Sequence, residues 1–225
     1  MRDEQWARIA ELWPGRVGHV GGPARANRLF VAAVRYRYRA GIPWRDLPAR
    51  VGDGTRVHRR FSRWATSGGW ARVFAALRAD ADDADARIDA TIVRAHQPSA
   101  GAPQKGGGDE AIGRSKGGVS TKIHATVAAL GNPTGFALPP GQASDLDGAD
   151  ELVPPLTAPT GSADKSDDAE ERVLARLRAA GTTAVLPPRR NRQDQREDDR
   201  DLYQARHLIA HFFCTLKQFR AIATR

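Results

Sequence analysis

The amino-acid sequence predicts an α/β protein in which a small helical domain precedes a mixed domain of strands and helices. Within residues 1–80, apolar residues recur at helical spacing. From residue 86 onward the pattern changes to short β-branched runs separated by turns that contain Gly and Pro. The end of the chain returns to helical spacing. We therefore expect two domains, one over 1–80 and one over 86–225.

Three helical segments are expected in the first domain, and each has a start or stop signal. Pro14-Gly15 ends the first segment, prolines bracket the turn 42–48, and Gly68-Gly69 interrupts the third segment. The expected segments span residues 3–13, 24–41 and 55–79.

Four arginines are interleaved with aromatic residues along the third segment. Such a helix can bind phosphates with its basic side chains while its aromatic side chains pack in a core. The pattern predicts a helical DNA-binding domain, and the alternative is a solvated cationic face on a structural bundle. Contact with bases and contact with phosphate alone both stay open. The residues are Arg56, Arg59, Arg60 and Arg63, with Phe61 and Trp64 among them.

The composition favours a polyanionic partner. Of 225 residues 40% are apolar, enough for a core, and 35 Lys and Arg against 26 Asp and Glu give a formal net charge of +9. Nucleic acid is the first candidate, and a basic protein without such a partner is the alternative.

The one cysteine, Cys214, excludes an intrachain disulfide and fits a reducing compartment. With neither a signal peptide nor an apolar run of ~18 residues, we expect a bacterial cytoplasmic protein.

The second domain is expected to alternate strands and helices. A strand over 86–96 is followed by a basic, Gly-rich loop at about 97–118, which we expect to be mobile. Residues 158–168 have almost no apolar content, so no strand is expected there. The other expected elements are two strands within 120–141, a helix within 144–157, a helix over 169–181, a strand over 182–188, a charged loop over 189–201 and one closing helix over 202–225.

The closing helix combines an apolar side with a polar stripe. Tyr203, Arg206 and Lys217 lie within about 60° of each other on a helical projection. Ala210 stands in the middle of this stripe. The apolar side holds Leu202, Ala205, Leu208, Ile209, Phe212, Leu216 and Phe219.

Asp89 lies inside an otherwise apolar strand, where an unpaired carboxylate costs several kcal/mol. It must accept hydrogen bonds or hold a cation. Carboxylates that converge from different elements can bind Mg²⁺, and two such ions about 4 Å apart can activate a hydroxyl and stabilise a leaving phosphate oxygen. Asp164 is the next candidate, with Asp167 and Asp168 as competitors, and the alternative is that these aspartates are solvated loop residues.

Several motifs, in the same order along nearly the whole chain, resemble the DDE transposases of bacterial insertion sequences, in the family usually numbered five. They are "GIPWRDLP", "VHRRFSRWATSGGW", "RIDATIVRAH", "AIGRSKGGVSTKIHATVAALGNP", "LPPGQASDLDGADEL", "ADK", "AAGTTAVLPPR" and "DRDLYQARHLI…FFCTLKQFRAIATR".

The resemblance implies a ribonuclease-H-like core in which two Asp and one Glu bind two Mg²⁺ ions. It also implies cleavage at the terminal inverted repeats of a mobile element and strand transfer into target DNA, by a homodimer in a synaptic complex that associates with the nucleoid. Asp89 and Asp164 match the two aspartates, as metal ligands, and Arg206 and Lys217 match the residues that face the phosphodiester. We expect DNA contacts from the arginines of the third segment and from Arg114, Lys116, Lys122 and Tyr203.

The chain departs from the family pattern at its third carboxylate. The signature Tyr, two residues, Arg, three residues, Glu, six residues, Lys is met by Tyr203, Arg206, Ala210 and Lys217, so an alanine replaces the glutamate. A methyl group cannot coordinate Mg²⁺. The missing strand and missing Gly-Tyr-Asp near Asp164 point the same way, as does an expected C-terminal truncation at Arg225.

Two functions from different classes remain open. The first is a DDE transposase with impaired or absent activity. The second is a catalytically dead remnant that still binds element ends as a DNA-binding module. A basic RNA-binding protein is a weaker third reading, because no aromatic RNA-recognition motif supports it.

Overall fold

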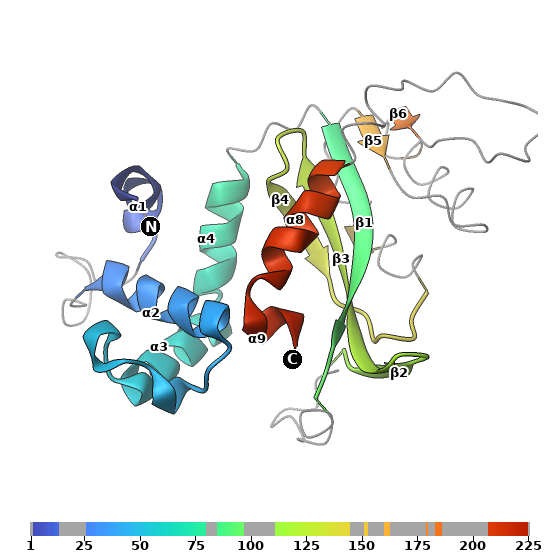
Figure 1. Cartoon of the computed structure of the whole chain (residues 1–225). Helices are drawn as coiled ribbons and strands as arrows, with labels where there is room; N and C mark the ends of the chain where they lie inside the picture. The colour runs from blue at the N-terminus through green and yellow to red at the C-terminus, as the bar shows by residue number, and fades with distance from the viewer. Residues whose placement is uncertain are drawn as a thin grey trace, which may run out of the picture. The chain divides into compact units, whose positions relative to one another are not determined.

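The computed structural model divides into two compact units, drawn in Figure 1. The first comprises residues 1–80 with 218–222, and the second comprises residues 81–217 with 223–225. None of the helices in the described part of the chain is long and apolar enough to cross a membrane. The structure describes residues 2–13, 26–79, 85–96, 111–144, 151–152, 160–162, 179, 183–185 and 207–224.

The first unit is helical, as predicted. Asp53 begins the third α-helix by accepting a hydrogen bond at 2.8 Å from the backbone N–H of Arg56, and Gly68 ends it with a positive φ of 69°. The turn predicted at 42–48 contains a short 3₁₀ segment. The elements are α1 (Asp3–Ala10), α2 (Asn27–Ala40), η1 (Trp44–Asp46), η2 (Ala49–Val51), α3 (Gly54–Thr66) and α4 (Gly69–Arg78).

Aromatic rings form the centre of the first unit. Trp13, only 2% exposed, stacks on Trp64 with ring centroids 4.5 Å apart. Phe30 of α2 meets Trp64 of α3 edge-on at 4.9 Å, and Trp70 of α4 lies 5.3 Å from Trp13. Such pairs contribute about 0.5–1.5 kcal/mol each beyond the area they bury. The same cluster therefore joins α2, α3 and α4.

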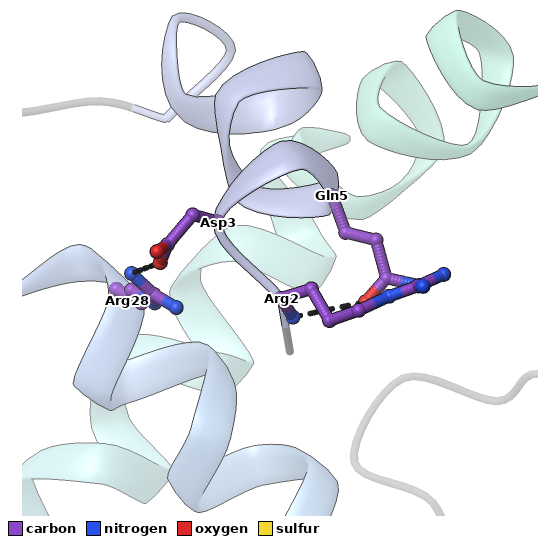
Figure 2. Close-up of polar contacts among 4 residues, drawn as sticks. All are labelled: Arg2, Asp3, Gln5 and Arg28. Carbon is purple, nitrogen blue, oxygen red and sulfur yellow. Dashed lines mark hydrogen bonds and ion pairs between the residues drawn. The ribbon is translucent and has the colours of Figure 1, made fainter.

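Polar contacts at the start of the chain fix α1 (Figure 2). The Gln5 side chain accepts a hydrogen bond at 3.0 Å from the backbone N–H of Arg2, which satisfies one free donor at the helix start. Asp3 forms an ion pair at 2.5 Å with Arg28 of α2. The Asp3 side chain is 90% exposed, so solvent screens this pair and its contribution is small.

The second unit contains a sheet whose strand order is β2-β3-β1-β5-β6, with β4 also paired to β3. β3 runs antiparallel to β1, β2 and β4, whereas β5 runs parallel to β1 and β6 runs parallel to β5. The strands are β1 (Asp85–Arg94), β2 (Gly113–Ser115), β3 (Gly118–Ala128), β4 (Pro133–Ala137), β5 (Thr160–Ser162) and β6 (Thr183–Val185).

Two short strands correct the sequence prediction. β5 lies in the segment 158–168, where no strand was expected, and β2 lies within the predicted loop 97–118. β5 forms because its backbone pairs with β1 on one side and β6 on the other, which requires no apolar side chain. β2 is held to β3 by the Ser115 hydroxyl, which donates to the carbonyl oxygen of Gly118 at 3.2 Å.

The closing helix also differs from the prediction, because it is not continuous. It divides into α8 (His207–Lys217) and α9 (Arg220–Ala223), and the break falls where the chain passes from one unit to the other. In the first unit, the guanidinium of Arg39 lies 5.4 Å from the ring centroid of Phe219. Residues 97–110, most of the helix predicted within 144–157 and nearly all of 169–206 lie outside the described residues.

Candidate functional site

Asp89 lies in the middle of β1 and is half-buried. The β-branched residues that follow it favour the extended conformation, and β1 pairs with β3 from Ala86 to Arg94. Its carboxylate accepts a hydrogen bond at 2.7 Å from the backbone N–H of Ala90. The predicted strand and the position of this aspartate within it are both observed, and the half-buried carboxylate accepts a hydrogen bond, as a partly desolvated charge requires.

α8 covers the sheet face on which Asp89 lies. Asp89 is opposite Ala125 of β3, and Ala125 is opposite Phe136 of β4, so all three share one face. The ring of Phe136 lies 5.9 Å from that of Phe212 in α8. α8 contacts both β1 and β3, as Figure 1 shows.

Burial along α8 separates a packed side from an exposed side. Ile209 is 0% exposed and Phe213 is 6% exposed, as expected for positions one turn apart on the buried side. Ala210 and Lys217 are both exposed. They are seven positions apart, so they lie within about 20° of each other on the helix. The structure therefore places Ala210 and Lys217 together on the exposed side of α8, while Tyr203 and Arg206 of the predicted stripe lie outside the described residues.

The rest of the predicted catalytic set lies outside the described residues. This applies to Asp164 and its competitors Asp167 and Asp168, and to Tyr203 and Arg206. Among the residues that the structure describes, no three His, Cys, Asp or Glu side chains come together in a group that could hold a metal ion. The possible metal ligands within the described residues therefore do not by themselves form a site for two Mg²⁺ ions.

α3 presents an exposed stripe of three arginines, which we call the α3 arginine stripe. Its members are Arg56, Arg59 and Arg63, which lie within about 60° of each other on the helix. Val57 and Trp64, 7% and 3% exposed, anchor the opposite part of the helix in the core. The stripe is a concentrated positive surface that can bind phosphate groups.

Asp53 caps the N-terminus of α3 by accepting a hydrogen bond from the backbone N–H of Arg56. The sequence analysis did not identify this cap, although an aspartate directly before a helix is a recognisable capping signal.

Arg60 is placed differently from its three neighbours. It is half-buried, and its guanidinium lies over the rings of Phe30 and Trp64. Burial, with a smaller effect from the charge of Arg63, lowers the pKa of Arg60 from its usual value. An arginine stays protonated at neutral pH even so.

The basic residues of the second unit also separate into two kinds. Arg114 and Lys116 are exposed, in β2 and in the turn that follows it. Lys122, on β3, is only 9% exposed, and its Nζ donates a hydrogen bond at 2.7 Å to the carbonyl oxygen of Ala143. The side chains of Arg114 and Lys116 can therefore contact a polyanion, whereas that of Lys122 is buried and hydrogen-bonded.

Comparison with known families gives two matches that together cover nearly the whole chain. Residues 85–225 match the family described as "Transposase DDE domain". Residues 1–74 match the family described as "Putative transposase of IS4/5 family". No solved structure matches the chain.

Two curated proteins resemble about half of the chain. "Uncharacterized protein y4sN" of Sinorhizobium fredii is 45% identical over 108 residues, which are 48% of this chain and 86% of that protein. "Insertion element IS402 uncharacterized 16.2 kDa protein" of Burkholderia cepacia is 35% identical over 125 residues, which are 50% of this chain and 82% of that protein.

Proposed function

Because the chain belongs to the transposase DDE domain family, we propose that it is a DNA transposase of an insertion sequence with impaired cleavage and strand transfer. Members of this family bind DNA and typically use Mg²⁺. One observation carries the proposed impairment: the exposed methyl group of Ala210 on α8, at the position of the third carboxylate. A methyl group supplies no oxygen ligand.

The finer assignment to insertion-sequence family five depends on the spacing of the closing helix. Tyr203, Arg206 and Lys217 keep the intervals of its signature around position 210. In this assignment Arg206 contacts a phosphate by a bidentate interaction and Lys217 contacts it as a point charge. The exposure of Lys217 supports its part of the assignment.

The strand order supports a ribonuclease-H-like core. The strands β4, β3 and β1 are antiparallel neighbours, and β5 and β6 continue the sheet in parallel beyond β1. In this proposal β1 is the central strand that carries the first catalytic carboxylate, and α8 is the helix that covers the same face.

The register of β1 and β5 supports Asp164 as the second carboxylate. Ser162 of β5 is opposite Arg87 of β1. Asp89 follows Arg87 by two positions in the sequence, and Asp164 follows Ser162 by the same interval. Asp167 and Asp168 lack this correspondence, so we assign the second position to Asp164.

The exposed basic residues define how the protein would bind DNA. We assign phosphate contacts to the α3 arginine stripe and to the hairpin residues Arg114 and Lys116. Joining two element ends requires two active centres, so we extend the proposal to a homodimer on double-stranded DNA.

The direct test is incubation of the purified chain with duplex DNA that carries the ends of its source element, in Mg²⁺ or Mn²⁺. Cleavage and joining products are separated by gel electrophoresis. The expected result is retarded migration of the DNA, with little cleavage by the wild-type chain and none by Asp89→Ala. Cleavage that survives Asp89→Ala would contradict the assignment of Asp89.

A DNA-binding module without chemistry is the second candidate function, and the alanine at position 210 favours it. It predicts salt-dependent binding to the element ends and no cleavage under any metal condition. Absence of DNA binding would contradict both candidates.

Single substitutions in the α3 arginine stripe should weaken DNA binding and reduce its salt dependence. Removing one phosphate contact lowers the slope of log K against log salt concentration by about 0.9. Arg56→Gln, Arg59→Gln and Arg63→Gln should each show this change in fluorescence anisotropy titrations at several salt concentrations. Glu4→Gln, an exposed change on α1, is the control, and equal slopes for all variants would contradict the assignment.

A further inference from the structure

Arg60 contacts α2 and its own helix at the same time. Its guanidinium carbon lies 4.3 Å from the ring centroid of Phe30 and 4.5 Å from that of Trp64. Its Nη2 donates a hydrogen bond to the side-chain oxygen of Asn27, the first residue of α2. One side chain therefore links the first turn of α2 to the middle of α3.

The position of Arg60 on α3 explains why it differs from the other arginines. On a helical projection it lies about 60° from Val57 and about 40° from Trp64, on the side of the core. Arg59, its sequence neighbour, is turned about 100° away and is exposed. The guanidinium of Arg60 thus contacts two rings and an amide oxygen, and the residue is half-buried.

We propose that Arg60 is a positioning residue for DNA binding, which holds α3 against α2 and thereby fixes the α3 arginine stripe, and that it does not contact DNA. Its effect on binding depends on the proposed DNA-binding function, whereas its effect on the first unit's stability does not. Lysine should not replace it, because an ammonium group cannot lie flat on a ring while donating to Asn27.

The test compares Arg60→Met and Arg60→Lys with the exposed control Arg59→Gln in the full chain. All five tryptophans lie between residues 6 and 70, so intrinsic fluorescence reports unfolding of the first unit selectively. Both Arg60 variants should lower its unfolding temperature, by about 4–8 °C if the lost contacts are worth ~1 kcal/mol. Arg59→Gln should leave this temperature unchanged.

The second readout is the affinity for a mixed-sequence DNA duplex as a function of salt concentration, measured well below the unfolding temperature. Arg60→Met should weaken binding by about tenfold with an unchanged slope, whereas Arg59→Gln should lower the slope by about 0.9. A reduced slope in Arg60→Met would overturn the proposal in favour of direct phosphate contact. Unchanged affinity together with a lower unfolding temperature would overturn the positioning role. If the wild-type chain and all variants fail to bind DNA, the proposed function fails and the positioning role fails with it. A lower unfolding temperature of the Arg60 variants would still show that Arg60 stabilises the packing of α3 on α2.

Discussion

Ala210→Glu should raise metal-dependent cleavage of the element ends by about 10²–10³-fold over the wild-type chain. Removing one group that stabilises charge in the transition state usually lowers the rate by about this factor, so restoring the carboxylate should raise the rate by a similar factor. Ala210 is exposed on α8, so a longer side chain has room there. The measurement is the initial rate of strand cleavage in Mg²⁺ and in Mn²⁺.

Two variants control for charge and for position. Ala210→Gln has nearly the shape of the glutamate without its charge, and it should gain no activity. Combining Ala210→Glu with Asp89→Asn should abolish the gain, because both carboxylates belong to one site in the proposal. No increase in Ala210→Glu, with DNA binding intact, would contradict the proposal that this position alone limits activity.

Phe30→Ala should destabilise the first unit by about 3–5 kcal/mol, the usual cost of truncating a buried phenylalanine. Phe30 is 5% exposed, meets Trp64 and Trp70, and supports the guanidinium of Arg60. The substitution leaves all five tryptophans in place, so denaturant unfolding followed by fluorescence measures the loss.

Leu29→Ala is the matched control for this prediction. Leu29 is the preceding residue on α2 and is 42% exposed, so the free energy of unfolding should change by no more than about 0.5 kcal/mol. Equal destabilisation by the two substitutions would mean that the aromatic cluster does not hold the first unit together.

The helices of the first unit could be predicted because their apolar residues recur at helical spacing and because Gly, Pro and capping residues mark their ends. β1, β3 and β4 were likewise predictable from β-branched residues and the turn between Ala128 and Pro133. β5 could not be predicted, since its stability comes from backbone pairing with β1 and β6, which a local pattern does not contain.

Individual site residues were predictable to different degrees. The interior position of Asp89 and the exposure of Ala210 and Lys217 follow from strand and helix periodicity. The periodicity of α3 places Arg60 on the side of Val57 and Trp64, but it does not identify its partners Asn27 and Phe30, because they come from another helix. Lys122 is a similar case, since its acceptor, Ala143, lies beyond β4.

Residues 218–222 belong to the same compact unit as residues 1–80, so this unit is assembled from both ends of the sequence. A ribosome that has made only the first eighty or so residues has not yet made Phe219, whose ring lies beside Arg39. The first unit can therefore reach its full set of contacts only after residues 81–217 of the second unit have been translated.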